Sequence, residues 1–175
     1  SGQPEIPYPR VVKATCGGSS VGVSIARDEE EYAAAKAEAF RYGDEVIVEQ
    51  YIKGREFSVG VLAGRALPVI EMAPREAFYD YRSKYQAGSA VETCPADLPP
   101  EKSREMQEIA VRVFAALRLK SYARMDFVMS GEGEIFCLEA NTLPGMTSTS
   151  LLPQEAAAAG MDFGQLCEMI LQLAM

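Results

Sequence analysis

Two alternating apolar segments late in the chain, joined by a short glycine-rich turn, constrain the fold most strongly. ARMDFVM (123–129) and EIFCLEAN (134–141) flank the turn Gly131-Glu132-Gly133. Each segment has the period-two pattern of a β-strand with one buried face. The pattern predicts an antiparallel hairpin, whose register determines which side chains share a face.

A four-residue loop at 131–134 sets that register. The predicted cross-strand pairs are Ser130 with Ile135, Val128 with Cys137, Asp126 with Glu139, and Arg124 with Asn141. Because side chains alternate along a strand, one face carries the charged and amide groups. These are Arg124, Asp126, Glu139 and Asn141. The opposite face is apolar and is the predicted core: Met125, Phe127, Met129, Phe136 and Leu138.

The polar face brings two carboxylates together. Asp126 and Glu139 repel when they lie directly opposite each other, so a positive charge is expected between them. Arg124 supplies part of that charge. The carboxylates and the Asn141 amide oxygen are also hard ligands, which suit Mg²⁺ bound together with substrate phosphates. A solvated polar face on an edge hairpin explains the same pattern, and the register alone does not separate the two interpretations.

A second glycine-rich segment lies near the start of the chain. Residues 10–14 and 21–25 are predicted strands, and Gly17-Gly18-Ser19-Ser20 joins them. This is not a Walker loop, since no GxxxxGK[ST] occurs and no helix follows. Successive backbone N–H groups in such a loop can still bind a phosphate, with Lys13 as a nearby point charge. Taken alone, the loop favours a plain hairpin turn.

The remaining segments alternate between strands and helices, which predicts an α+β fold with antiparallel sheets and packed helices. The predicted helices are 28–43, with Asp28 as its cap and Gly43 as its end, 101–117, one beginning near Ser150, and 162–174. The predicted strands are 46–52 and a hairpin over 56–70 that turns at Ala63-Gly64, and residues 74–97 are expected to be loop-rich. Lys53-Gly54 breaks a strand and predicts a boundary between lobes 1–53 and 54–175.

Composition excludes several classes of function. The chain has no histidine, which removes Ser-His and Cys-His nucleophile schemes and most zinc sites. A net charge of -8 argues against a duplex nucleic-acid partner. No apolar stretch is long enough to span a bilayer. The four cysteines show no CxxC spacing and are expected to be free thiols of a cytosolic protein.

Two further acids, Glu49 and Glu56, flank the break at Lys53-Gly54. A carboxylate near a hinge between lobes can accept hydrogen bonds from an adenine amino group or a ribose hydroxyl. The pattern itself is equally that of two surface charges.

Six motifs in order and at matching spacings make the chain resemble the ATP-grasp part of D-alanine–D-alanine ligases. They are KATCGGSSVGVS (13–24), VIVEQYIKGREFSV (46–59), FYDYRSKY (78–85), ARMDFV (123–128), LEANTLPGMT (138–147) and SLLP (150–153). The resemblance covers nearly the whole chain. It implies an ATP-grasp fold, with part of the central lobe in 1–53 and the C-terminal lobe in 54–175.

The resemblance also implies roles for the matching residues. ATP binding is implied for Lys13 and Lys84 on the phosphates, Glu49, Ile52 and Phe78 at adenine, Glu56 at ribose, and Leu138. Metal binding, with two Mg²⁺ ions or Mn²⁺ as an alternative, is implied for Asp126, Glu139 and Asn141. Catalytic roles are implied for Ser19, Tyr85 and Arg124, and binding of the second substrate's carboxylate for Ser150 and Leu151.

The reaction implied by this resemblance is ATP-dependent ligation of two D-alanines for peptidoglycan precursors. One carboxylate attacks the γ-phosphorus to give an acyl phosphate, and the amine of a second D-alanine displaces the phosphate. Positioning and positive charge do most of this work, so the absence of histidine is consistent with it. The implied setting is a cytoplasmic homodimer of the full-length protein.

Two departures from the family pattern affect the expectation. The N-terminal domain of the family, with its substrate-binding glutamate, has no counterpart here, and Gln50 stands where some members have lysine. We therefore expect the chain alone to bind nucleotide but to have weak or no ligase activity. The alternatives are a D-alanine–D-lactate ligase, another ATP-grasp carboxylate–amine ligase, or a binding module without turnover. Between the D-alanine–D-lactate product and the D-alanine–D-alanine dipeptide, Tyr85 favours the dipeptide.

Overall fold

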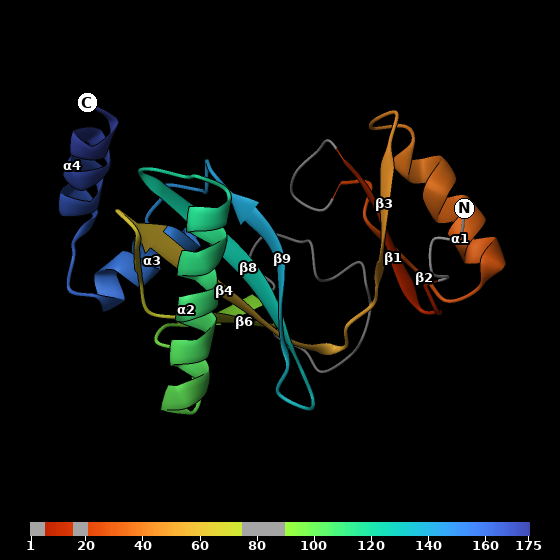
Figure 1. The fold of residues 1–175 in the computed structure, drawn as a ribbon, viewed down its shortest axis with the longest axis horizontal. Helices are drawn as coiled ribbons and strands as arrows, with labels where there is room; N and C mark the ends of the chain where they lie inside the picture. Colours follow the sequence, from red (N-terminus) through yellow and green to blue (C-terminus); the bar gives the residue numbers. More distant parts are fainter. Residues whose placement is uncertain (1–5, 16–20, 75–89) are drawn as a thin grey trace. The chain divides into compact units, whose positions relative to one another are not determined.

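The computed structural model describes residues 6–15, 21–74 and 90–175. These residues form two compact units, the first ending at Ile52 and the second beginning at Lys53 (Figure 1). Each unit has its own antiparallel sheet. No helix within the described ranges is long and apolar enough to cross a membrane.

Unit 1 is a three-stranded sheet with one helix. Its elements are β1 (Arg10–Ala14), β2 (Ser24–Ala26), α1 (Glu29–Ala39) and β3 (Val46–Gln50). The strand order is β2-β1-β3, so the predicted pairing of the strands on either side of the glycine-serine segment is confirmed. Val12, Ala35 and Ala39 form a small core between the sheet and the helix.

Helix α1 begins as predicted but ends early. The Asp28 carboxylate accepts from the Glu31 backbone N–H at 2.9 Å. The Glu31 carboxylate in turn accepts from the backbone N–H of Arg27 at 2.7 Å, one residue before the position that a capping box requires. The helix ends well before Gly43, so that part of the prediction is wrong.

Unit 2 contains a six-stranded sheet. Its strands are β4 (Gly54–Leu62), β5 (Arg65–Ala66), β6 (Ile70–Pro74), β7 (Ala90–Thr93), β8 (Tyr122–Ser130) and β9 (Ile135–Asn141). The order is β7-β6-β4-β8-β9, with β5 paired to β4. Ala63 and Gly64 turn between β4 and β5 with positive φ angles, as predicted for a tight hairpin. The expectation of loop over 74–97 is wrong at strand β7. This four-residue edge strand is too short to show the alternation of apolar and polar residues.

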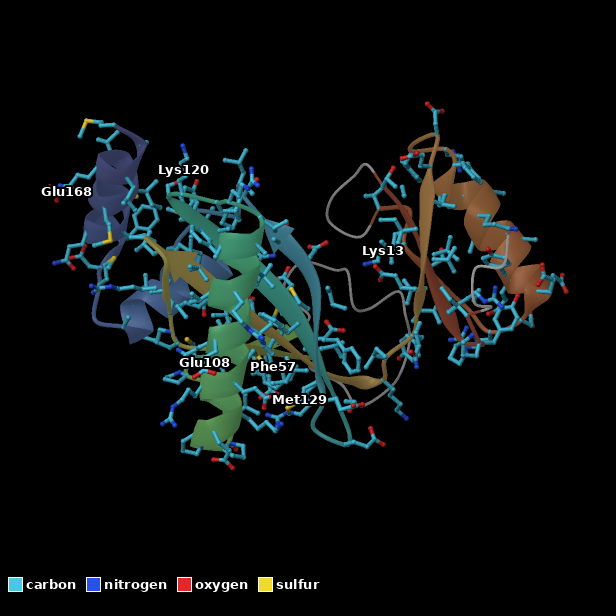
Figure 2. All side chains as sticks on the ribbon, in the orientation of Figure 1. Lys13, Phe57, Glu108, Lys120, Met129 and Glu168 are labelled. Carbon is cyan, nitrogen blue, oxygen red and sulfur yellow. The ribbon has the colours of Figure 1, made fainter. Side chains whose placement is uncertain are left out.

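Helices cover both faces of this sheet. They are α2 (Pro100–Ala116), α3 (Leu151–Ala158) and α4 (Phe163–Ala174). Helix α2 lies across one face and buries the main apolar core, where Phe57 and Met129 lie beside it (Figures 1 and 2). Helices α3 and α4 form a second cluster through Leu152, Ala156 and Leu166, with Leu62 and Leu67. Among the described cysteines, Cys94, Cys137 and Cys167 are free thiols.

The hairpin of β8 and β9 has the predicted residue pairs at the polar face but different pairs near the turn. Arg124 pairs with Asn141 and Asp126 with Glu139, as predicted. Beyond a shift at Asp126/Phe127, however, Val128 pairs with Phe136 rather than Cys137. The turn is one residue shorter than expected. Met129 pairs with Ile135, and the Ser130 backbone N–H donates to the Glu134 carbonyl at 2.9 Å, which leaves a three-residue loop in which Gly133 adopts a φ of 83°. The shorter turn and the extra residue of a bulge at Leu138 offset each other.

The bulge also changes the apolar face of β9. Ile135 and Ala140 pack against the main core, in place of the predicted Phe136 and Leu138. Leu138 is 42% exposed, so its assignment to the core is wrong. The reason is that one unpaired residue reverses the alternation of side chains beyond it.

Gly54 at the start of β4 lies against the neighbouring strand, which makes its missing side chain necessary. A Cβ there would lie 2.0 Å from the carbonyl oxygen of Met129. We expect Gly54→Ala to lower the free energy of unfolding by about 1–3 kcal/mol, because the paired backbones must separate. Urea denaturation of the chain measures this. Gly131→Ala is the control, since a Cβ there meets nothing within 4 Å; equal stability of the two variants would contradict the close approach.

Candidate functional site

The polar face predicted from the hairpin register is present and is closely hydrogen-bonded. The Arg124 guanidinium donates to both oxygens of Asp126, from Nε to Oδ1 at 2.8 Å and from Nη2 to Oδ2 at 2.7 Å. The Asn141 amide nitrogen donates to Asp126 Oδ2 at 2.9 Å and to Glu139 Oε1 at 3.0 Å. These four side chains, from two neighbouring strands, therefore form one network.

The network is shielded from water on the Arg124 side. The side chains of Arg124 and Asp126 are only 18% and 16% exposed. Burial acts to lower the pKa of Arg124, but the hydrogen bonds and charge of Asp126, with the charges of Glu155 and Glu139, raise it on balance. Arg124 is thus a fixed positive charge among three acids.

The donor set fits a hard divalent cation. Asp126 Oδ2 and Glu139 Oε1 converge on one atom, the Asn141 amide nitrogen, at 2.9 and 3.0 Å. Oxygens that converge on one donor in this way are spaced so that they can also approach one cation. Carboxylate and amide oxygens are the ligands that Mg²⁺ prefers. The Asn141 amide here presents its nitrogen to the two carboxylates, so it would have to rotate by half a turn to offer its oxygen to a cation. Within the described ranges, no group of three or more His, Cys, Asp or Glu side chains has the arrangement of a metal site.

Three residues of β4 extend the same face of the sheet. Ser58 is the cross-strand partner of Asp126, Gly60 that of Arg124, and Glu56 that of Val128. Directly opposed residues point to the same side of a sheet. Glu56, which the resemblance assigns to ribose, therefore lies on the same face as Asp126 and is half-buried there.

Glu155 on α3 is a buried acid beside this face, and the sequence analysis missed it. Its side chain is fully buried, and neither carboxylate oxygen makes a hydrogen bond of good geometry to a described residue. Desolvation raises its pKa from 4.5 to about 8, although the Gly60 backbone, Arg124 and Ser58 act in the opposite direction. A signal was available in the sequence: Glu155 is the single acid in the otherwise apolar helix LLPQEAAA.

In unit 1, the structure brings together two residues predicted to contact different parts of a nucleotide. Lys13 Nζ lies 2.7 Å from Glu49 Oε2, across β1 and β3, with Lys13 labelled in Figure 2. The pattern had not indicated this ion pair. The two side chains are 20% and 36% exposed, so a ligand can reach both. Each side chain could then exchange its partner in the ion pair for a contact with the ligand. Ile52 ends this unit and is half-buried.

Ser150 caps α3, as expected of a residue near that helix start, but its hydroxyl turns to the preceding loop. Ser150 Oγ accepts from the Thr147 backbone N–H at 3.0 Å and lies 2.8 Å from Thr147 Oγ1. It makes no hydrogen bond to the helix backbone through its side chain. Leu151 follows as the first helical residue and is half-buried.

The other predicted site residues lie outside the described residues. They are Ser19, Phe78, Lys84 and Tyr85. Their roles stay predictions.

Solved structures of known proteins share this fold. The D-alanine–D-alanine ligase of Bacillus anthracis complexed with ATP matches with a TM-score of 0.81 and 36% identity, over 95% of this chain and 53% of that one. The VanG D-Ala:D-Ser ligase of Enterococcus faecalis matches with a TM-score of 0.83 and 32% identity, over 97% and 50%. The fold is therefore the predicted α+β fold of the ATP-grasp class.

Sequence comparison identifies the family within that class. The family described as D-ala D-ala ligase C-terminus matches residues 3–172. The D-alanine–D-alanine ligases of Syntrophotalea carbinolica and Desulfotalea psychrophila are 51% and 45% identical to the chain, over 94% and 97% of it. The chain belongs to the D-alanine–D-alanine ligase family and corresponds to its C-terminal part. It spans about half the length of the curated relatives it matches, at 53% and 54% of these two.

Proposed function

We propose that this chain is the nucleotide- and metal-binding part of a ligase that uses ATP to join two D-alanines. The observation that carries the proposal is the network of Arg124, Asp126, Glu139 and Asn141, in which a cation-binding set adjoins a fixed guanidinium. The names of the relatives and the ATP in the Bacillus anthracis ligase structure support the same assignment. Because ATP is the proposed energy source, we also propose the cytoplasm as the compartment.

In this proposal the acids bind the metal and the arginine stabilises negative charge. Asp126, Glu139 and Asn141 hold Mg²⁺, which when bound offsets negative charge on the ATP phosphates. Arg124 stabilises the negative charge that develops when an amine attacks the activated carboxyl carbon of an acyl phosphate. Its shielded position strengthens this interaction, because fewer water molecules screen the guanidinium.

Unit 1 supplies the nucleotide contacts of the proposal. Lys13 binds phosphate oxygens and Glu49 accepts from adenine, so that their ion pair is exchanged for two contacts with the ligand. Glu56 of unit 2 binds the ribose, and Leu138, exposed by the bulge, gives an apolar contact to the base. The backbone near Ile52 and the side chains of Phe78 and Lys84 complete the set.

Substrate binding uses the start of α3 in this proposal. Backbone N–H groups at a helix start favour a carboxylate, so Ser150 and Leu151 bind the carboxylate of the second D-alanine. Because the Ser150 hydroxyl is bonded to Thr147, its reorientation accompanies binding. Ser19 and Tyr85 position the first D-alanine.

The direct test is product analysis by mass spectrometry. A full-length protein containing this chain is incubated with ATP, Mg²⁺ and D-alanine, alone or with D-lactate or D-serine as the second substrate. We expect D-alanyl-D-alanine and ADP as the main products near neutral pH. Dominant depsipeptide or D-alanyl-D-serine would overturn the choice of second substrate, and the absence of ADP formation with any D-amino acid would overturn the ligase assignment. We expect the isolated chain to bind ATP but to form little product.

The metal assignment predicts the behaviour of Asp126→Asn. Loss of one carboxylate charge weakens cation binding, so the Mg²⁺ concentration for half-maximal ADP formation rises by about 10–100-fold. Titration of Mg²⁺ at saturating ATP in the full-length protein measures this. Glu132→Gln removes a charge from the exposed turn of the same hairpin and is the control. An unchanged Mg²⁺ requirement in Asp126→Asn would remove Asp126 from the metal site.

A further inference from the structure

Glu155 reaches the site from a separate element and takes a position that the sheet leaves open. Its Oε2 lies where a side chain on Gly60 would be, 2.5 Å from the position of a Cβ on that residue. Any other residue at position 60 would displace the carboxylate or Leu152, whose Cδ1 is 2.4 Å from the same point. The absent side chain of Gly60 is therefore what admits Glu155.

The position is meaningful because Gly60 is the cross-strand partner of Arg124. Opposed residues in an antiparallel pair have Cβ atoms about 4.5–5.5 Å apart and interact when their charges are opposite. A carboxylate in the side-chain place of residue 60 thus stands where an acidic partner of Arg124 would stand. The charge of Glu155 acts on Arg124 accordingly, raising its pKa together with Asp126 and Glu139.

Arg124 needs such a second partner if Asp126 binds a metal. Both guanidinium hydrogen bonds of Arg124 go to the oxygens of Asp126, and Oδ2 also accepts from Asn141. A cation on Asp126 competes for those oxygens. A buried arginine that loses its acceptors is costly and changes its direction unless another acceptor holds it.

On the basis of the proposed function, we propose that Glu155 is a positioning residue, which holds the Arg124 guanidinium in place while Asp126 is engaged by the metal. It acts from the buried side of Arg124 and touches neither ATP nor amino acid. The Ser58 hydroxyl is buried on β4 opposite Asp126, has no hydrogen-bond partner of good geometry in the described residues, and belongs to the same polar layer.

The role explains why an acid with so few hydrogen bonds is kept in an apolar helix. A fully buried carboxylate destabilises the folded state unless it is paired. A glutamine of the same shape avoids this cost, so a merely structural residue at this position gains nothing from being charged. The expected signature is therefore loss of arginine positioning without loss of stability.

The test uses Asp126→Ala, which withdraws the first partner of Arg124 without any metal. In this chain at pH 8.5, where Glu155 with its pKa of about 8 is mostly ionised, NMR measures the water-exchange rate of the Arg124 Nε–H, with its signal assigned from Arg124→Lys. We expect the exchange rate in Asp126→Ala to stay within about threefold of the rate in the unmodified chain. In Asp126→Ala/Glu155→Gln we expect the rate to rise by about tenfold or more, because the Nε–H then loses its last hydrogen-bond acceptor. Asp126→Ala/Glu108→Gln is the control, since Glu108 is an exposed acid of α2, on the opposite face (Figure 2).

Equal exchange rates in Asp126→Ala and Asp126→Ala/Glu155→Gln would overturn the proposal, whatever the reaction of the full-length protein. In that protein at the same pH of 8.5, Glu155→Gln is expected to lower kcat about tenfold with KM for ATP unchanged, since a displaced catalytic group costs rate rather than binding. The loss should largely disappear in an Arg124→Lys background. Independent, additive losses would also contradict a role through Arg124. Failure of the unmodified protein to form dipeptide overturns the ligase assignment and leaves the NMR result to decide the role of Glu155.

Discussion

Arg124→Gln in a full-length protein containing this chain is expected to lower ligase turnover by about 10²–10³-fold, the usual effect of removing a fixed donor to a developing negative charge. Glutamine keeps a hydrogen-bond donor but loses the positive charge that three acids surround. Because the proposed interaction exists mainly in the transition state, kcat should fall much more than KM for ATP changes.

Arg112→Gln is the matched control, since it removes an exposed arginine from α2, on the opposite face of the sheet. Thermal unfolding of both variants separates catalysis from folding, because removing Arg124 also leaves Asp126 and Glu139 without their neutralising charge. Turnover of Arg124→Gln within a few-fold of the unmodified protein would contradict a catalytic role for the guanidinium.

The second large effect concerns how stability depends on pH. Burial raises the pKa of Glu155 from 4.5 to about 8, so the folded chain holds a proton there that the unfolded chain releases. Its contribution to stability is complete below about pH 4.5 and is lost as the pH rises through 8. Across this window the loss amounts to roughly 5 kcal/mol. The charge of Arg124 lowers the pKa of Glu155 and so limits this loss, and the charge of Asp126 raises the pKa and adds to it.

Glu155→Gln should remove this dependence, because glutamine does not titrate. Urea denaturation at pH 5.5, 7 and 8.5 measures the free energy of unfolding as a function of pH. We expect the variant to be the more stable chain by a margin that grows with pH, smallest at pH 5.5 and largest at pH 8.5. Parallel pH profiles for the two chains would show that Glu155 is not the group responsible.

The sequence predicted the shared polar face of Arg124, Asp126, Glu139 and Asn141 well because that face is local. Arg124, Asp126, Glu139 and Asn141 lie on two strands joined by one turn, so period-two alternation and a single register place all four together. The same reasoning failed a few residues away, at Phe136 and Leu138. A bulge depends on packing across the sheet, and alternation along one strand does not reveal it.

Three other features that the sequence did not predict join distant segments. The pair of Lys13 and Glu49 forms only when β3 aligns beside β1. The approach of Glu155 depends on how α3 packs over β4, which no local period records. Strand β7 exists because β6 offers it a free edge. The single acid in an apolar helix was the one available sign among these.

The bulge at Leu138 separates two parts of the hairpin that would otherwise change together. It lies between the turn and the residue pairs of the site, so the turn and the site do not share one continuous register. A residue gained at the far end is absorbed before it reaches Asp126 and Glu139. The hairpin can therefore vary in length during evolution, or accept an engineered insertion at its tip, while the spacing of Asp126 and Glu139 is preserved.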